Sequence, residues 1–137
     1  MSLTIRTCTH DDANAIAALY QQSAKYLRSL GDSATFGFNV EAYLRDGFGE
    51  HPAFEGLIAE LNGKAVGYVL YTFTYDTDRT MRILYVLDLL VDEYARGQSI
   101  GRKLMDSVRD VAKAKDAGEL MWSVYKHNKG AEAFYKH

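Results

Sequence analysis

A short basic loop and one isolated acid are the residues of this sequence that could do chemistry. The loop spans residues 96–101 (RGQSIG), follows an apolar run at 86–91 (VLDLLV), and opens a segment whose apolar residues recur at helical spacing. A turn from a strand into a helix leaves backbone N–H groups unpaired at the helix N-terminus, where the helix dipole adds partial positive charge. The loop therefore predicts an anion-binding site, best suited to a phosphate or a pyrophosphate.

The loop matches neither of the two common nucleotide-binding motifs. No Gly-Lys-Ser/Thr follows it, so it is not a P-loop. Gly97 and Gly101 stand four apart with Ser99 between them, which departs from the dinucleotide-binding spacing. On these residues alone, a simple strand-to-helix loop with a solvated Arg96 explains the sequence as well as a phosphate-binding loop does.

The isolated acid is Asp88, which interrupts the apolar run. We expect that run to be a strand covered on both faces, where an acid is costly to bury without a partner or a task. A structural salt bridge would explain it, and so would a catalytic or substrate-binding carboxylate. The apolar surroundings favour the second explanation.

Length and composition indicate a single globular domain over residues 1–137, with 47% hydrophobic and 25% charged residues. No apolar run is long enough to span a bilayer and no signal-peptide core is present, so we expect a cytoplasmic protein without a membrane partner. The net charge of −2 argues against nucleic acid as a partner. The charge is −4 over residues 1–90 and +2 over residues 91–137, which suits a cationic substrate and a polyanionic cofactor.

The cysteine and histidine content points to neither a disulfide framework nor a metal. Cys8 is the one cysteine of the sequence, so an internal disulfide is excluded. The four histidines at positions 10, 51, 127 and 137 lack metal-ligand spacing, and we assign no metal.

Hydrophobic periodicity and turn residues predict the elements that must position the loop and the acid. Strands are expected near 3–6, 54–61, 64–75, 86–91 and 120–124, with Asn62-Gly63 as a two-residue hairpin turn. Helices are expected after Asp12, after Asn39, from residue 100 to about 117–118, and after residue 128. This order predicts an α/β fold with a mixed, strongly twisted sheet.

Two motifs resemble those of the GNAT N-acetyltransferases. Arg96-x-x-Ser99-x-Gly101 after an apolar strand is similar to that superfamily's acyl-CoA pyrophosphate loop, Gln/Arg-x-x-Gly-x-Gly/Ala. The segment at 128–135 (NKGAEAFY) is similar to its Asn-x-x-Ala-x-x-hydrophobic-Tyr motif. Longer strings, at 45–54 (RDGFGEHPAF), 73–76 (FTYD) and 84–85 (LY), resemble the spermidine/spermine and thialysine N-acetyltransferase branch. The likeness extends from about residue 5 to residue 136.

The resemblance implies a GNAT-like twisted central sheet flanked by helices, and acetyl-CoA as the acyl donor. It also implies acetyl transfer to the primary amine of a small cationic acceptor of the polyamine or diamine kind. The positions that the resemblance assigns to the donor are Leu89, Leu90, Val91, Arg96, Gly97, Gln98, Ser99, Ile100, Gly101, Arg102, Asn128 and Ala131. As a phenol with pKa near ~10, Tyr135 would be the general acid for the departing thiolate, whose conjugate acid lies near ~8.5.

The acceptor amine, with a pKa near ~10, is mostly protonated at neutral pH and needs a carboxylate to attract it and to take its proton. The positions that the resemblance assigns to the acceptor are Tyr26, Asp76, Asp88, Trp122 and His127. Of these, Asp88 would be the base. Tyr26 could equally be helix packing, and Asp76 a turn residue.

Three departures from the family pattern bear on these assignments. Leu87 stands where polyamine acetyltransferases carry a Glu proposed as base, which leaves Asp88 or a water chain for that role. Ser99 stands where the family prefers Gly, so a Cβ enters a loop that approaches phosphate closely. The sequence stops at His137, and the C-terminal strands with which relatives complete the sheet and often the dimer interface are missing from it. An uncovered edge would favour association, and we expect a homodimer.

Other functions remain open on the sequence. Within the enzyme class, the acceptor could be a lysine analogue, an amino acid or a protein amine. Outside it, the chain could be a weakly active acyl-CoA-binding module, or a nucleotide-binding regulator, for which the phosphate-binding Lys motif is lacking.

Overall fold

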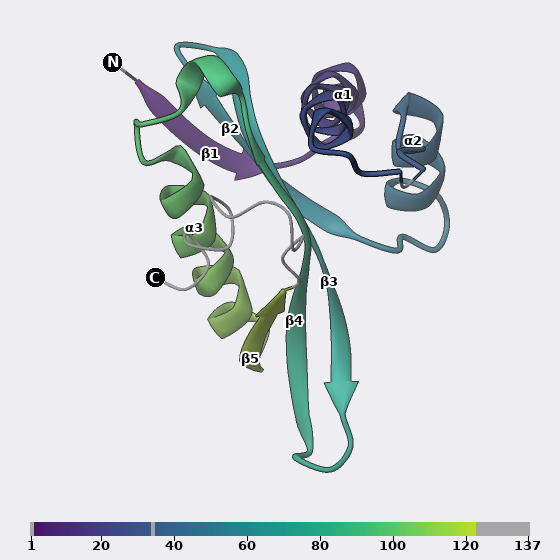
Figure 1. The fold of residues 1–137 in the computed structure, drawn as a ribbon. Coiled ribbons are helices and arrows are strands. Elements are labelled where there is room, and N and C mark those ends of the chain that lie inside the picture. Colours follow the sequence, from purple (N-terminus) through teal and green to yellow (C-terminus); the bar gives the residue numbers. More distant parts are fainter. Residues whose placement is uncertain (1, 34, 123–137) are drawn as a thin grey trace.

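The computed structural model describes residues 2–33 and 35–122. Within those ranges the chain forms a twisted mixed sheet of strand order β1-β2-β3-β4-β5, antiparallel except for the parallel pair β4 and β5 (Figure 1). The strands are β1 (Leu3–Thr7), β2 (Glu55–Leu61), β3 (Lys64–Asp76), β4 (Met81–Val91) and β5 (Ala117–Trp122). The expected α/β fold with a mixed, twisted sheet is confirmed.

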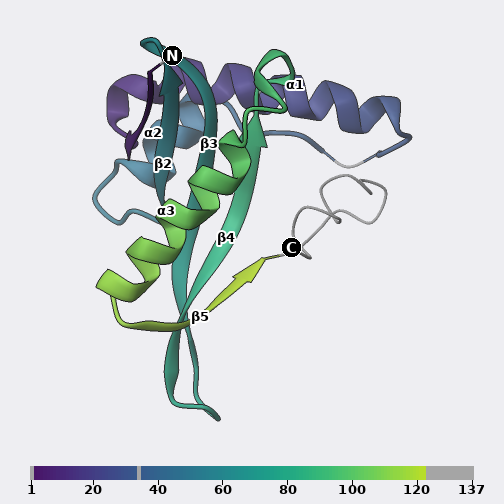
Figure 2. The same ribbon diagram turned by 90° about the vertical axis from the view of Figure 1, so that its left-hand side faces the viewer.

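Helices cover both faces of the sheet. The two helices α1 (Ala13–Ser29) and α2 (Val40–Gly47) lie against one face, and α3 (Ile100–Ala114) lies across the other (Figure 1, Figure 2). Short 3-10 turns, η1 (His10–Asp12) and η2 (Glu93–Ala95), precede α1 and follow β4. Each helix turns one apolar stripe inward, so the molecule has one hydrophobic cluster on each side of the sheet.

Local sequence signals account for most element ends. Asn62 and Gly63 both adopt positive φ, as a two-residue hairpin turn requires. Asn39 caps α2, because its side-chain oxygen accepts a hydrogen bond from the N–H of Ala42 at 2.8 Å. The predicted stripe of α3 at residues 100, 104, 108 and 112 is buried under the sheet.

The predicted end of the third helix was wrong. The helix α3 ends at Ala114, and Ala117 and Gly118 begin β5, which was expected to start at Leu120. The helix stops because Asp116 turns left-handed, at φ +61°. Gly118 serves close packing and not a cap, since a Cβ there would lie 3.3 Å from the sulfur of Met81. Residues 123 and 124 of the expected strand, and the helix expected after residue 128, lie outside the described residues.

The expectation that the central strand is covered on both faces was also wrong, because Leu87 in β4 is 48% exposed. Pairing with β3 jumps from Leu70 opposite Asp88 to Tyr71 opposite Val86, so Leu87 has no partner residue on β3. This extra residue is a β-bulge, which shifts the side-chain alternation of the strand. The apolar residues 84, 86, 89 and 91 all belong to the cluster under α3, an order that regular alternation cannot produce.

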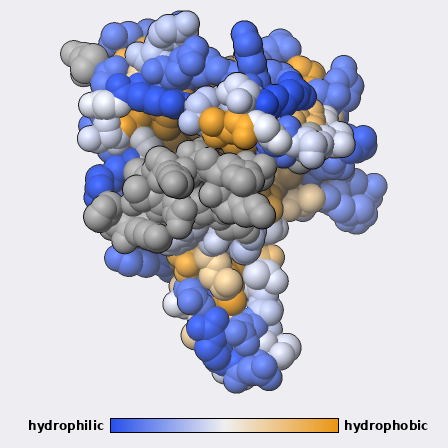
Figure 3. Space-filling view, viewed as in Figure 1, coloured by the Kyte–Doolittle hydropathy of each residue, from blue (hydrophilic) through white to orange (hydrophobic). Residues whose placement is uncertain are grey.

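The far halves of β3 and β4 project as a hairpin beyond the helices (Figure 1). The end of this hairpin has a hydrophilic surface (Figure 3). Asp76 accepts hydrogen bonds there from the backbone N–H groups of Asp78 and Arg79. Arg79 closes the tip further by pairing with Asp76 and with Glu119 of β5. None of the described helices is both long and apolar enough to cross a bilayer.

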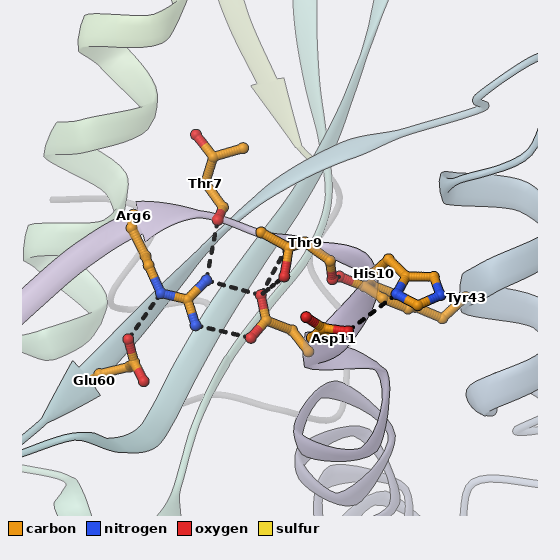
Figure 4. Close-up of polar contacts among 8 residues, drawn as sticks. Arg6, Thr7, Thr9, His10, Asp11, Tyr43 and Glu60 are labelled. Carbon is orange, nitrogen blue, oxygen red and sulfur yellow. Dashed lines mark hydrogen bonds and ion pairs between the residues drawn. The ribbon is translucent and has the colours of Figure 1, made fainter.

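A buried carboxylate ties β1 to the start of α1. Asp12 is 7% exposed and forms a two-bonded pair with the Arg6 guanidinium, each bond 2.8 Å long. Its carboxylate also accepts the backbone N–H of Thr9 at 2.7 Å. Arg6 reaches Glu60 of β2 as well, so one guanidinium joins two strands and a helix (Figure 4). This fixes the direction in which α1 crosses the sheet.

We expect Asp12→Asn to lower the free energy of unfolding at pH 7 by about 2 kcal/mol, the value of charged hydrogen bonds at a buried site. The Arg6 guanidinium holds the pKa of Asp12 below its usual value. The stabilisation that Asp12 contributes is therefore fully present above pH about 4, the pKa of an aspartate in the unfolded chain. It is lost as the pH falls through the lower pKa that Asp12 has in the folded protein. Urea unfolding at pH 7 and at low pH measures both effects.

The matched control is Asp11→Asn, since the neighbouring Asp11 side chain is 92% exposed. That variant should stay within about 0.5 kcal/mol of the parent. Equal losses in the two variants would contradict the account of Asp12.

Candidate active site

The β-bulge places Asp88 on the face of the sheet that α1 and α2 cover. Asp88 pairs with Leu70, which belongs to the hydrophobic cluster under these two helices. If the strand alternated regularly through Leu87, Asp88 would share the α3 face with Val86. The bulge thus moves one carboxylate to the opposite side of the sheet.

Two tyrosines face the Asp88 carboxylate there. The hydroxyl of Tyr68, from β3, lies 3.4 Å from the Asp88 Oδ2. Tyr20 comes from α1, and its pKa is raised by burial and then by the Asp88 charge, which places its phenol near the carboxylate. Burial raises the pKa of Asp88 to about 6, while the Tyr68 hydrogen bond lowers it. At neutral pH Asp88 is mostly ionised, and it is a stronger base than an exposed aspartate.

The structure does not support a salt bridge as the reason for Asp88. Within residues 2–33 and 35–122, no Lys, Arg or His forms an ion pair with its carboxylate. A half-buried carboxylate without a cation beside it in this part of the chain can receive a cationic group from outside.

The edge of β4 beyond the bulge offers backbone hydrogen-bonding groups. Asp92 donates its N–H to the carbonyl of Val66 on β3. Alternate residues of a strand point to the same edge, so Leu89 and Val91 direct their N–H and C=O groups away from β3. Within the described residues β5 pairs with β4 only as far as Val86. An extended ligand can therefore pair with Leu89 and Val91 as an added strand.

The loop that follows β4 has the conformation of an anion-binding loop. Gly97 (φ +84°) and Ser99 (φ +61°) are both left-handed, and the turn delivers the chain into the N-terminus of α3. Arg96, Arg102 and Lys103 are exposed around it. The side-chain oxygen of Gln98 is buried and has no hydrogen-bond partner in the described part of the chain. Unpaired helix N–H groups, exposed cations and this side chain all lie on one short segment.

Helix α1 connects the loop with the carboxylate. The Arg96 guanidinium lies 5.8 Å from the centre of the Tyr26 ring, within cation–π range. Gln22 accepts the backbone N–H of Glu93 at 2.8 Å. Tyr26 lies about 9 Å further along the helix axis than Tyr20. Tyr20 is therefore the tyrosine of α1 near the carboxylate, and Tyr26 is the one at the loop. The structure thus brings Tyr26 to the predicted donor site.

Other predicted positions are not brought to Asp88. Asp76 is the turn residue of the projecting hairpin, six residues beyond Leu70, or about 20 Å along the strand. Trp122 lies opposite Val86 and packs with the cluster under α3, on the other face. The remaining positions, His127, Asn128, Ala131 and Tyr135, lie outside the described residues.

Neither the roles of Tyr20 and Tyr68 beside Asp88 nor the bulge were predicted from the sequence. The alternation of residues 68, 70 and 72 against 69, 71 and 73 defined two faces of β3, which was a usable signal for Tyr68. Matching Tyr68 to Asp88 needed the register, and the register depends on the bulge. A bulge at Leu87 leaves no mark in a continuous apolar run.

Comparison with known proteins identifies the family. Residues 16–137 match the profile of the acetyltransferase (GNAT) family. The chain belongs to the GNAT acetyltransferase family. It is 35% identical to a thialysine N-ε-acetyltransferase from Sus scrofa over 143 aligned positions, covering 98% of this chain and 82% of that protein.

Two further likenesses agree with this family. A Homo sapiens spermidine/spermine N(1)-acetyltransferase-like protein is 41% identical over 76 residues, which is 50% of this chain and 11% of that protein. A solved protein of Bacillus halodurans superposes with a TM-score of 0.83 at 25% identity, covering 97% of this chain and 90% of that one. The chain is thus an N-acetyltransferase enzyme with the GNAT fold, in the branch that the sequence motifs indicated.

The described residues of this GNAT enzyme fit the family's acyl donor, acetyl-CoA. The open edge at Leu89 and Val91 suits the extended pantetheine arm, and the basic turn before α3 suits the pyrophosphate. The side-chain oxygen of Gln98, which lacks a partner in the described part of the chain, is an acceptor and can receive an N–H or O–H group of the donor but not a phosphate oxygen. No group of three or more His, Cys, Asp or Glu among the described residues could hold a metal ion.

The family's preference for Gly at position 99 has a conformational reason in this fold. Ser99 adopts φ +61° and ψ +23°, and its side chain makes no capping hydrogen bond to α3. A left-handed non-glycine residue costs about 1–2 kcal/mol. The serine therefore adds backbone strain and returns no capping bond.

We expect Ser99→Gly to raise the free energy of unfolding by about 1 kcal/mol, because it relieves that strain. The control is Ser107→Gly in the middle of α3, where glycine should cost about 0.5 kcal/mol. Denaturant unfolding of the two variants should give shifts of opposite sign. A loss of stability in Ser99→Gly would contradict the strain assignment.

Proposed function

We propose that this enzyme transfers the acetyl group of acetyl-CoA to the primary amine of a small cationic acceptor of the lysine-analogue or polyamine kind. In this proposal Asp88 binds the acceptor's ammonium group and takes its proton. The observation that carries the proposal is the half-buried Asp88 carboxylate, which has no cation beside it in the described part of the chain and lies among tyrosines.

The chemistry follows from the charge at Asp88. Acetyl-CoA supplies the acetyl group, which leaves the sulfur and joins the amine nitrogen. The ammonium nitrogen loses two protons in all: Asp88 takes one before the attack, and the second leaves as the amide forms, while the departing thiolate gains a proton. A carboxylate with a pKa of about 6 is ionised at neutral pH and can hold the ammonium group before transfer. Tyr20 and Tyr68 line the same face and suit a cation beside the carboxylate.

The residue before Asp88 bears on acceptor choice. Leu87 is exposed beside the carboxylate and carries no charge, so one acid is available at this point of β4. One carboxylate suffices for the reacting ammonium of a lysine analogue, whereas a polyamine carries further ammonium groups that gain nothing here. The Sus scrofa relative named for thialysine supports a lysine-analogue acceptor, and the human relative supports a polyamine.

The positions outside the described residues keep the roles that the family motif implies. Within the proposal Tyr135 protonates the departing thiolate, Asn128 and Ala131 contact the donor, and His127 lies toward the acceptor. Asp76 and Trp122 would contact the acceptor only if a second subunit brings them to the site. We also propose that residues 1–137 act as one catalytic domain, that the enzyme is cytoplasmic, and that it forms a homodimer.

The test is release of free thiol from acetyl-CoA with spermidine, spermine, putrescine, thialysine and lysine, each against a reaction without amine. Turnover with at least one of these amines supports the proposal. If no amine gives turnover while acetyl-CoA still raises the melting temperature, the protein is a donor-binding module and the proposal fails.

We expect Leu87→Glu to raise kcat/KM for spermidine relative to thialysine by about 2- to 5-fold at low salt. The added exposed carboxylate attracts the second ammonium group, and an exposed ion pair is worth about 0.2–1 kcal/mol. The ratio should fall back at high salt as the charges are screened.

Leu87→Gln is the control, because it has the same shape as the glutamate without its charge. Its spermidine-to-thialysine ratio should match that of the parent enzyme. The charge argument fails if both variants change the ratio equally.

A further inference from the structure

We propose that Tyr68 is a positioning residue, whose hydroxyl holds the Asp88 carboxylate in one orientation on the face of the sheet that α1 and α2 cover. The inference rests on the proposed function of Asp88 as the group that receives the acceptor amine. Tyr68 itself is not placed in contact with the reacting atoms.

The strand register brings the two side chains together. Tyr68 pairs with Leu90 and Asp88 pairs with Leu70, so the two residues are diagonal neighbours on adjacent strands. Both point to the same face because the bulge at Leu87 has turned Asp88 over. The hydroxyl donates to Asp88 Oδ2 across 3.4 Å. That distance is longer than the donor–acceptor distance of a strong O–H···O bond. The hydroxyl therefore orients the carboxylate but does not offset the rise in pKa that burial causes.

Packing alone explains the ring of Tyr68 but not its hydroxyl. The residue is 0% exposed in the cluster under α1 and α2, where phenylalanine would fill nearly the same volume. A buried hydroxyl without a partner is costly, and Asp88 supplies that partner. Among residues 2–33 and 35–122, the contact with the carboxylate is the one that makes this buried hydroxyl favourable.

Within the described residues, the side chains beside Asp88 come from β3, α1 and β4 itself. From β3 these are Tyr68 and the apolar Leu70, and from α1 the Tyr20 phenol, which the Arg28 charge also influences. On β4 itself the neighbours Leu87 and Leu89 carry no charge. Burial and the Tyr68 hydrogen bond are the causes that set the pKa of Asp88. Because the bond stabilises the ionised form, its removal raises that pKa further.

The experiment compares the pH dependence of kcat/KM in the parent enzyme, Tyr68→Phe and Tyr43→Phe. Activity should rise with pH as Asp88 ionises, with a midpoint near 6 in the parent. In Tyr68→Phe we expect this midpoint to move up by about one pH unit, so that kcat/KM falls by about 5-fold at pH 6, by up to about 10-fold at lower pH, and recovers at higher pH. A purely structural role would lower activity equally at all pH values.

Tyr43→Phe is the matched control. Tyr43 is also 0% exposed, and its hydroxyl donates to the backbone carbonyl of Thr9 at 2.8 Å, away from Asp88. This variant loses one buried hydrogen bond and should leave the midpoint unchanged. Movement of both midpoints, or of neither, overturns the inference.

A second readout separates this inference from the proposed function and does not need a folded Tyr68 variant. In the parent protein, the ring-carbon NMR signal of Tyr68 should titrate with a midpoint near the pKa of Asp88, and Asp88→Asn should abolish that titration. If no amine is acetylated but the titration is seen, the proposed function fails and the contact stands. If the parent shows no such titration, the inference is overturned whatever the activity.

Discussion

The candidate site of this GNAT enzyme depends on one extra residue in a strand. Leu87 has no partner on β3, and this bulge transfers the next side chain, Asp88, from the α3 face of the sheet to the face under α1 and α2. The apolar residues on both sides of it keep packing against α3, so the hydrophobic core does not lose by the change. The cost is confined to one half-buried carboxylate, whose partial desolvation raises its pKa to about 6.

The elements around Asp88 supply the other parts of the candidate site. Beyond the bulge, β4 presents the backbone of Leu89 and Val91 to an extended ligand and leads into the left-handed turn before α3. Helix α1 spans both ends, with Tyr20 near the carboxylate and Tyr26 stacked on Arg96 of the loop. The Arg6 to Asp12 pair ties the start of this helix to β1.

The sequence predicted what depends on short-range patterns. The α3 stripe, the Asn62-Gly63 turn and the Asn39 cap follow from spacing and turn chemistry, and all were confirmed. The resemblance of residues 96–101 to the family's loop agrees with the basic left-handed turn that the structure shows, and residues 16–137 match the family profile. The end of α3 was missed because the helix was expected to run to the glycine at 118, whereas Asp116, of a residue type that can adopt the left-handed conformation, stops it earlier.

What could not be predicted depends on register. An apolar run such as that at 86–91 contains no signal for a bulge, so exposure of Leu87 and the facing of Asp88 and Tyr68 were invisible. Asp76 matched a family position in sequence, yet its carboxylate caps the tip of the hairpin through Asp78 and Arg79. A motif locates a residue along the chain, while the strand pairing decides which side chains it meets.

The most direct test of the central claim is steady-state kinetics of Asp88→Asn with the best amine, together with its affinity for acetyl-CoA. The account predicts that kcat/KM for the amine falls by about 100-fold or more, within the range of general-base contributions, while donor affinity and melting temperature stay near those of the parent. Turnover close to that of the parent, or a loss explained entirely by weaker acetyl-CoA binding, would contradict it.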